Sequence, residues 1–329
     1  MAIDTIAIVG AGAWGTALAQ TAARAGREVL LVARDPAVAA TIAQRHANPR
    51  YLPGVALDPA IGASADLADA AGADAVLLTV PAQTVRAVCR ALTDPKILVI
   101  CAKGFETATG ARLSEVVAQE RPQSACAVLS GPNFAGEVAL GLPAAATLAC
   151  ADATLGRELA EALSSASFRA YWSEDVVGAE VGGGLKNVLA IAAGIVAGRG
   201  LGENARAAIV TRGLAELARL GEALGGRRET LMGLSGLGDL VLTATSLTSR
   251  NMAFGHAIGA GADPQALRRH PGALVEGVFS AGAVARLAAA HGVEMPISAA
   301  VDAILEGRLD IEQALDGLMR RPIRPEAAG

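Results

Sequence analysis

The sequence predicts an α/β protein built as a doubly wound sheet domain followed by an all-helical domain. Near its start, the apolar run 6–9 leads into a glycine-rich turn that begins at Gly10 with the spacing G-x-G-x-x-G. Further apolar runs alternate with helical segments, which is typical of a sheet of parallel strands. From about Glu174 these runs disappear and helical periodicity takes over. We therefore expect one domain over residues 1–173 and a second over residues 174–329.

The glycine-rich turn favours a bound dinucleotide. Gly10 permits the tight turn, Gly12 allows a pyrophosphate to approach the backbone, and Gly15 lets the next helix pack closely on the strand. The helix expected over 16–25 directs its N-terminal amides at the anion. A turn with a purely structural role is the alternative, because this motif alone can arise by chance.

The next strand, expected over 27–33, ends at residues that bear on the choice of cofactor. An acidic side chain at this place usually binds the ribose hydroxyls of NAD, whereas a nearby arginine favours the 2′-phosphate of NADP. Here Arg34 comes first and Asp35 follows. This order favours NADPH without excluding NADH. Stacking of Arg34 on adenine, or its simple solvation, are the alternatives.

Three more buried strands are expected, with helices between them. The strands cover 75–80, 96–101 and 125–130, and the helices include 84–92 and 112–119. Continuous apolar runs fit a parallel sheet covered on both faces, whose ligands bind at the carboxyl ends of the strands. Polar residues follow two of these strands, at Lys103 and in the segment 130–137. We expect Lys103 to point towards the ligand, with a solvated lysine at a turn as the alternative.

The helical half contains polar clusters that its apolar pattern does not require. Lys186 and Asn187 stand just before an apolar helix expected over 188–197. Burial would lower the pKa of such a lysine and make it a proton donor or acceptor, with Asp239 as its counter-charge. Arg250 offers a fork of donors suited to a phosphate. Ion pairing between helices is the alternative. Other helices are expected over 205–224, 280–291 and 298–306.

Composition excludes several classes of protein. The chain has 329 residues, of which 52% are hydrophobic and 18% charged, and its net charge is −4. No basic stripe favours nucleic acid or an anionic membrane. The start lacks the pattern of a signal peptide, and no apolar run reaches the roughly 18 to 20 residues that span a bilayer. The four cysteines are far apart, so we expect buried thiols in a reducing cytosol and no metal site.

Seven short motifs, in order, resemble the bacterial-type NAD(P)-dependent glycerol-3-phosphate dehydrogenases over essentially the whole chain. They are Gly-Ala-Gly-Ala-Trp-Gly-Thr-Ala-Leu-Ala from Gly10, Ala-Lys-Gly at 102–104, Ser-Gly-Pro-Asn-Phe-Ala at 130–135, Leu-Lys-Asn-Val at 185–188, Gly-Leu-Gly-Asp-Leu at 236–240, Ser-Arg-Asn at 249–251 and Val-Glu-Gly at 275–277. The resemblance implies a Rossmann-like domain and a helical domain of the 6-phosphogluconate-dehydrogenase C-terminal type. It also implies reversible NAD(P)H-dependent reduction of dihydroxyacetone phosphate to sn-glycerol 3-phosphate for phospholipid synthesis.

The resemblance also implies roles for individual residues. The catalytic residues are Lys186, Lys103 and Asp239. Lys186 is the general acid/base, Lys103 contacts both cofactor and substrate, and Asp239 belongs to the catalytic polar network. The substrate-binding residues are Lys103, Gly131, Asn133, Lys186, Asn187, Asp239, Ser249, Arg250 and Asn251. The cofactor-binding residues are Gly10, Gly12, Ala13, Trp14, Gly15, Arg34, Lys103, Ala135, Arg250, Leu274 and Glu276.

Three positions depart from the family pattern. Asn133 replaces the usual Ser or Thr, Ala13 replaces a frequent Ser, and Leu274 replaces Val. A 3-hydroxyacid or ketopantoate reductase is the alternative enzyme, although the Ser-Arg-Asn motif argues against it. A non-catalytic NAD(P)-binding sensor on the same fold is the alternative of another class. A homodimer is compatible with the sequence, which does not give an oligomeric state.

Overall fold

The computed structural model of the protein describes residues 3–269, 274–323 and 325. The chain divides into two compact units, which we describe separately. Unit 1 comprises Met1–Lys103 and Ala111–Glu180, and unit 2 comprises Gly104–Gly110 and Val181–Gly329. The division falls within one helix, α7 (Val176–Gly198).

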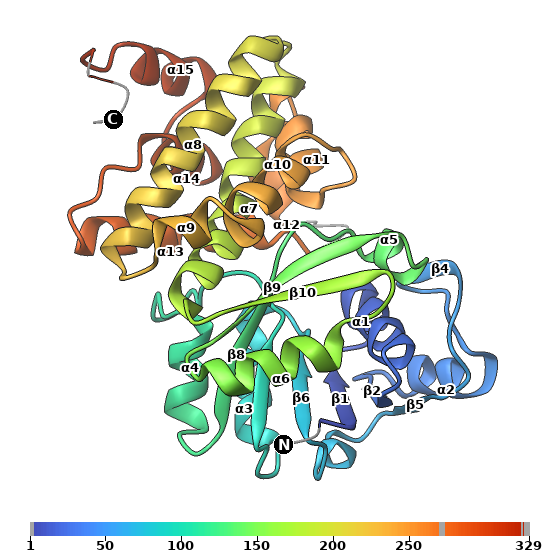
Figure 1. The fold of residues 1–329 in the computed structure, drawn as a ribbon. Helices are drawn as coiled ribbons and strands as arrows, with labels where there is room; N and C mark the ends of the chain where they lie inside the picture. The colour runs from blue at the N-terminus through green and yellow to red at the C-terminus, as the bar shows by residue number, and fades with distance from the viewer. Residues whose placement is uncertain (1–2, 270–273, 324, 326–329) are drawn as a thin grey trace. The chain divides into compact units, whose positions relative to one another are not determined.

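Unit 1 is built on an eight-stranded sheet with the order β10-β9-β8-β7-β6-β1-β2-β5 (Figure 1). The strands are β1 (Thr5–Val9), β2 (Glu28–Val32), β5 (Ile61–Ser64), β6 (Ala75–Leu78), β7 (Ile97–Ile100), β8 (Ala125–Ser130), β9 (Ala144–Cys150) and β10 (Phe168–Ser173). The predicted parallel sheet is confirmed from β5 to β8. The prediction omitted β5, β9 and β10, and the pairing of β8 with β9 is antiparallel.

Helices cover both faces of this sheet, as a doubly wound fold requires. The helices α1 (Ala13–Arg24), α2 (Pro36–Arg45) and α6 (Ala153–Leu163) share one apolar core with Ile8. The helices α3 (Val85–Ala91) and α4 (Leu113–Glu120) share the other core with Val9. Successive side chains of β1 thus enter opposite cores. The shorter elements are β3 (Ala47–Asn48) and its antiparallel partner β4 (Leu52–Ala56), η1 (Leu67–Ala70), η2 (Ala82–Thr84) and α5 (Ala135–Ala139).

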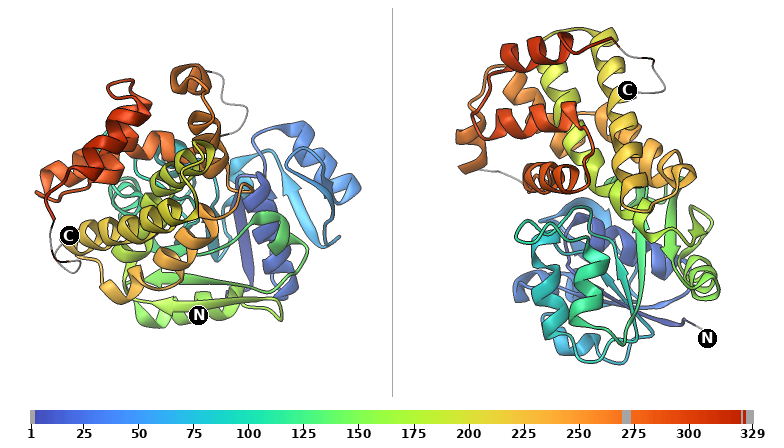
Figure 2. Two further views of the ribbon diagram at one scale, coloured as in Figure 1. Left: turned by 90° about the horizontal axis from the view of Figure 1, so that it is seen from above. Right: turned by 90° about the vertical axis from the view of Figure 1, so that its left-hand side faces the viewer.

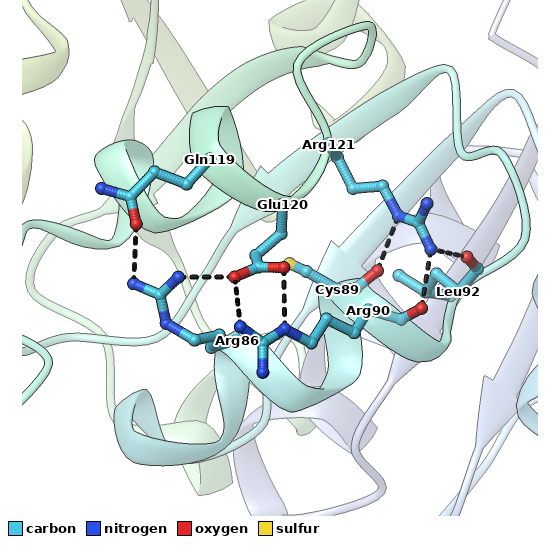
Figure 3. A network of polar contacts seen from close by, with 7 residues as sticks. All are labelled: Arg86, Cys89, Arg90, Leu92, Gln119, Glu120 and Arg121. Carbon is cyan, nitrogen blue, oxygen red and sulfur yellow. Dashed lines mark hydrogen bonds and ion pairs between the residues drawn. The ribbon is translucent and has the colours of Figure 1, made fainter.

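Charged side chains join α3 to α4 on the second face (Figure 3). Glu120 accepts hydrogen bonds from Arg90 Nε at 2.8 Å and from Arg86, and these two arginines lower the pKa of Glu120 to about 2. Arg121 donates to the backbone carbonyls of Cys89 at 2.6 Å and Arg90 at 2.8 Å, and it also contacts the carbonyl of Leu92. A cation at the last carbonyls of α3 complements the dipole of that helix. The network therefore fixes the C-terminal ends of both helices.

The cysteines are free thiols, and three of them are buried. Cys89, Cys101 and Cys150 confirm the predicted burial, whereas Cys126 is half-buried. Burial raises the pKa of Cys89 to about 11 and raises the pKa of Cys101 still further. These thiols are therefore not ionised near neutral pH and pack as small apolar groups.

Unit 2 is a bundle of helices (Figure 2). After α7 come α8 (Glu203–Ala223), α9 (Arg228–Leu231), the π-helix η3 (Leu234–Gly238), α10 (Asp239–Ala244), α11 (Arg250–Gly259), α12 (Pro264–Arg269), α13 (Glu276–Ala290), α14 (Pro296–Leu305) and α15 (Ile311–Met319). By length and composition α7 could cross a membrane, but 89% of its apolar window is buried inside the structure. It is therefore the core helix of the bundle.

The helix α7 corrects one prediction. We expected an apolar helix over 188–197 headed by Lys186, but α7 begins at Val176 and Lys186 lies inside it. Three glycines precede Lys186, and glycine disfavours helix interiors. In the structure they allow close packing instead. A Cβ on Gly182 would lie 2.6 Å from the carbonyl oxygen of Ser235, and one on Gly184 would lie 2.8 Å from the ring of Phe105.

Glycines also let α7 and α11 approach each other. A Cβ on Gly194 would lie 2.2 Å from the carbonyl oxygen of Met252, and one on Gly255 would lie 2.1 Å from that of Ile191. Real Cβ atoms do not approach backbone oxygens so closely. The two helices therefore pack backbone against backbone, and no side chain can be added without moving them apart.

This packing predicts opposite effects for two Gly→Ala substitutions in helices of unit 2. Gly194→Ala should lower the free energy of unfolding by roughly 1–3 kcal/mol or more, because a backbone rather than a flexible side chain must move. Gly317→Ala in α15 should leave it unchanged or raise it by up to about 1 kcal/mol, because a Cβ there meets nothing within 4 Å. Urea unfolding followed by circular dichroism measures both. Equal effects would contradict the close approach of α7 and α11.

Candidate active site

The turn from Gly10 to Gly15, called the dinucleotide turn below, lies at the carboxyl end of β1 and opens α1. Gly10 has a φ of 113°, which an L side chain rarely adopts. A Cβ on Gly15 would lie 1.9 Å from the carbonyl oxygen of Gly10, so Gly15 is required for packing. A Cβ on Gly12 would meet nothing within 4 Å. Packing within the protein does not explain Gly12, and an open backbone there fits a closely approaching pyrophosphate.

Two other residues of the turn were predicted to contact the cofactor. Ala13 is the first residue of α1 and is half-buried. The indole Nε1 of Trp14 is buried and has no hydrogen-bond partner among the described residues.

At the end of β2, Arg34 is exposed and Asp35 is half-buried. Both carboxylate oxygens of Asp35 have partners. Oδ1 accepts from the backbone N–H of Ala37 at 3.0 Å and so caps α2, and Oδ2 pairs with Arg50 at 2.7 Å. The charge of Asp35 is thus offset by Arg50, which leaves it poorly prepared to bind ribose hydroxyls.

Lys103 follows β7, and its Nζ donates to the carbonyl oxygen of Gly131 at 2.8 Å, joining the ends of β7 and β8. Gly131 has a φ of 155°, and a Cβ there would lie 2.9 Å from Ala146 Cα. The amide of Asn133 donates to the carbonyl oxygen of Ala145 at 3.1 Å. Ala135 is the first residue of α5 and is half-buried. The structure therefore gathers these predicted residues at the carboxyl edge of the unit 1 sheet.

Lys186 is buried in unit 2, where Asp239 and Thr243 of α10 contact it. Its Nζ donates to Asp239 Oδ1 and to Thr243 Oγ1, at 2.8 Å each. Asp239 is 1% exposed and Lys186 is 8% exposed. The carboxylate offsets the cost of removing the ammonium from water, and the hydroxyl satisfies one more of its protons. Asp239 is thus the counter-charge that the sequence suggested.

A second polar chain lies beside this ion pair. Asn251 Nδ2 donates to Asn187 Oδ1 at 2.9 Å, and Asn251 Oδ1 accepts from the backbone N–H of Gly277 at 2.9 Å. Both side-chain amides are buried. The chain links α7, α11 and the first turn of α13, and so fixes the side chain that follows Lys186 in the sequence.

The remaining predicted residues of unit 2 lie at or just before the first residues of helices. Ser249 caps α11 by accepting from the backbone N–H of Met252 at 3.3 Å, and Arg250 is the exposed first residue of that helix. Leu274 is half-buried, and Glu276 is the half-buried first residue of α13. Arg250 and the free N–H groups expected at the start of α11 suit an anion such as a phosphate.

Sequence reasoning missed Thr243. Its signal was available, because Thr243 follows Asp239 by four residues and the two therefore lie on one face of a helix. Among the described residues no group of three or more His, Cys, Asp and Glu side chains could hold a metal ion.

A glycine-rich dinucleotide turn in an α/β unit and a buried lysine–aspartate pair in a helical unit define an NAD(P)-dependent oxidoreductase. Family models described as the N-terminus and C-terminus of NAD-dependent glycerol-3-phosphate dehydrogenase match residues 5–156 and 175–316. The chain belongs to this family.

Similar proteins and a similar crystal structure carry the name of the same family. The glycerol-3-phosphate dehydrogenase [NAD(P)+] of Rhodospirillum rubrum is 56% identical over 98% of this chain and 94% of its own length. That of Parvibaculum lavamentivorans is 52% identical over 99% of both chains. The crystal structure of the Coxiella burnetii glycerol-3-phosphate dehydrogenase has a TM-score of 0.91 at 40% identity, covering 97% of this chain and 99% of that one.

The contact between Lys186 and Thr243 predicts a selective effect on turnover. Thr243→Val removes one acceptor from the ammonium and should lower kcat for dihydroxyacetone phosphate by roughly tenfold, the effect of losing one hydrogen bond to a charged group. Thr245→Val is the matched control, because its hydroxyl bonds the carbonyl of Val241 in its own helix. Steady-state kinetics with both variants test this. Equal kcat values for the two would show that Thr243 does not orient Lys186.

Proposed function

We propose that this chain catalyses the reversible reduction of dihydroxyacetone phosphate to sn-glycerol 3-phosphate with NAD(P)H, and so supplies glycerophospholipid synthesis. The observation that carries this proposal is the buried contact of Lys186 with Asp239 and Thr243. A ketone reductase needs one group that stabilises the developing oxyanion and gives it a proton. A buried, well-oriented ammonium meets both needs.

The chemistry divides between cofactor and protein. Bound NAD(P)H supplies a hydride to C2 of the ketone. Lys186 stabilises the negative charge that develops on the C2 oxygen, and its Nζ–H bond breaks as the new O–H bond forms. Asp239 and Thr243 hold the amine in place, and solvent restores its proton. In the reverse direction Lys186 accepts the proton from the C2 hydroxyl.

The use of lysine supports this role. Of the 28 basic Lys and Arg residues in the chain, only Lys96, Lys103 and Lys186 are lysines. Arginine is never deprotonated in proteins, so it can balance a charge but cannot donate and recover a proton. A chain that uses arginine almost everywhere for positive charge keeps lysine at the two proposed catalytic positions.

The substrate phosphate is assigned to the start of α11. Arg250 supplies a planar pair of donors there, and Ser249 and Asn251 flank it in sequence. Lys103, Gly131 and Asn133 are further substrate contacts in this proposal, and Lys103 also contacts the cofactor. Ala135, Leu274 and Glu276 are further cofactor contacts.

Replacement of Lys186 tests the proposal. Lys186→Ala should lower kcat by roughly 10²–10⁴-fold, the usual contribution of general acid–base catalysis. Lys186→Arg should also be inactive, because a guanidinium keeps the charge but does not release its proton. Initial rates of NADPH and NADH oxidation with dihydroxyacetone phosphate measure the effect.

The matched control for this test is Lys96→Ala, which removes the one lysine outside the proposed site. It should keep full activity. Circular dichroism and cofactor titration check that each variant folds. Activity of Lys186→Arg close to that of the native enzyme would refute the role of proton donor, and absence of turnover by the native protein with either cofactor would refute the reaction.

We further propose that NADPH is preferred over NADH. Two features of unit 1 support this preference. Arg34 is exposed at the end of β2, and the neighbouring Asp35 is occupied by Arg50 and by the backbone of α2. The carboxylate that would favour NADH is therefore engaged, while the guanidinium that would bind a 2′-phosphate is not buried.

Replacement of Arg34 separates the two cofactors. Arg34→Ala should raise KM for NADPH by roughly tenfold or more, through loss of a charged hydrogen bond, and leave KM for NADH nearly unchanged. Arg45→Ala, which removes an exposed arginine at the end of α2, is the control and should affect neither. Equal losses with both cofactors would show that Arg34 does not bind the 2′-phosphate.

We place the enzyme in the cytoplasm, where buried free thiols stay reduced. The homodimer stays a prediction, which light scattering during size-exclusion chromatography would decide. A non-phosphorylated ketoacid that outperformed dihydroxyacetone phosphate would favour the ketopantoate or 3-hydroxyacid reductases, and nucleotide binding without turnover would favour a sensor.

A further inference from the structure

A short ribbon of residues 46–58, here called the β3–β4 ribbon, packs against the dinucleotide turn from within unit 1. The helix α2 ends at Arg45, and the next residue, His46, has a φ of 46° that turns the chain into β3. The ribbon closes where the N–H of Leu57 donates to the carbonyl of His46 at 2.8 Å. Leu52 and Leu57 are buried in the same core as α1. The ribbon is therefore firmly anchored and can hold a side chain in a fixed place.

That side chain is Asn48, which is 1% exposed. Its Nδ2 donates to the carbonyl oxygen of Ala11 at 2.9 Å and to Thr16 Oγ1 at 2.8 Å. Both amide protons are thus used, one on the dinucleotide turn and one on the first part of α1. Because a carbonyl oxygen can only accept, the contact with Ala11 fixes which end of the carboxamide faces the turn.

The contact with Ala11 also fixes a backbone N–H. The peptide between Ala11 and Gly12 is planar and trans, so its C=O and its N–H point in opposite directions. Holding the carbonyl oxygen of Ala11 against Asn48 therefore aims the N–H of Gly12 away from the ribbon. Thr79 acts in the same way one residue earlier, because its Oγ1 donates to the carbonyl oxygen of Gly10 at 2.7 Å. Two successive carbonyls of the turn are thus held by side chains, that of Asn48 buried and that of Thr79 half-buried.

We propose that Asn48 is a positioning residue for the cofactor, which holds the dinucleotide turn so that the N–H of Gly12 faces the pyrophosphate. This inference rests on dinucleotide binding at the turn. Amides fixed in advance bind an anion without the cost of ordering the loop. Asn48 itself acts through Ala11. Since NADPH and NADH share the pyrophosphate, Asn48 contributes equally to the binding of both cofactors. Arg34, by contrast, is proposed to contribute to the binding of NADPH alone.

Replacement of Asn48 in the full-length protein tests this. Asn48→Ala should raise Kd by about tenfold for NADPH and for NADH alike, the scale expected when a buried hydrogen bond is lost. The value of kcat at saturating cofactor should stay within about threefold of the native value, because the proton-transfer residues are untouched. Fluorescence titration of each cofactor gives Kd, and steady-state rates give kcat.

The matched control is Gln20→Ala. Gln20 Oε1 accepts from the backbone N–H of Asp58 at 2.7 Å, so it anchors the other end of the same ribbon to the same helix. Gln20→Ala should lower stability but leave both Kd values unchanged. A rise in Kd equal to that of Asn48→Ala would mean that any loosening of the ribbon weakens binding, and would overturn the proposal. A loss confined to NADPH would overturn it too, because it would assign Asn48 to the adenosine end.

A second variant keeps the test independent of cavity formation. Asn48→Asp has the same size but offers only acceptor oxygens, one of them against the carbonyl of Ala11. It should raise both Kd values more than Asn48→Ala does, because it also adds negative charge near the pyrophosphate. Native-like Kd values for Asn48→Asp would overturn the proposed role of Asn48 but not dinucleotide binding at the turn. Failure of the native protein to bind either cofactor would instead overturn the assignment of the turn.

Discussion

The buried charge of Lys186 is the constraint on which unit 2 depends. An ammonium inside an apolar helix is costly unless a carboxylate and further acceptors surround it. Asp239 and Thr243 meet that need only if α10 lies close to α7. Gly182 and Gly236 allow the chain to pack closely there. A Cβ on Gly182 would lie 2.6 Å from the carbonyl oxygen of Ser235, and one on Gly236 would lie 1.9 Å from the carbonyl oxygen of Leu231. The buried ammonium thus requires small residues around it, although glycines such as Gly182 lower the helix propensity of α7.

Unit 1 meets a different constraint, because the pyrophosphate contacts proposed for the dinucleotide turn are backbone N–H groups. The strand β1 and the helix α1 fix the ends of the dinucleotide turn, but they do not orient the peptides between them. Side chains from elsewhere in the chain do so: the hydroxyl of Thr79 bonds the carbonyl of Gly10, and the amide of Asn48 bonds the carbonyl of Ala11. The same principle operates at the next strands, where Lys103 holds the carbonyl of Gly131. The protein's own side chains therefore order the carboxyl edge of the sheet.

Much of this arrangement could be predicted from the sequence, and the failures have physical causes. Buried parallel strands such as β7 and β8 show continuous apolar runs, and they were found. The strand β10 lies at the sheet edge with Tyr171 and Trp172 about half-exposed, so it lacks such a run. Glycine propensity misplaced the start of α7, since the contacts that favour Gly182 come from residues about fifty positions away. Asn48 carried no local signal, because its partners lie more than thirty residues earlier.

Asp35 shows why a residue at the expected place in the sequence does not by itself indicate which cofactor binds. An acidic side chain after β2 suggests a ligand for the ribose, and Asp35 stands one position beyond the end expected for it. In the structure, however, Asp35 caps α2, because a carboxylate just before Pro36 is well placed to accept from the first N–H groups of that helix. Its second oxygen then pairs with Arg50, which the β3–β4 ribbon brings back from fifteen residues further on. The β3–β4 ribbon thus holds both Asn48, which contacts the dinucleotide turn, and Arg50, which offsets the charge of Asp35. If both proposals hold, affinity for the part shared by the two cofactors and the choice between them depend on this one ribbon.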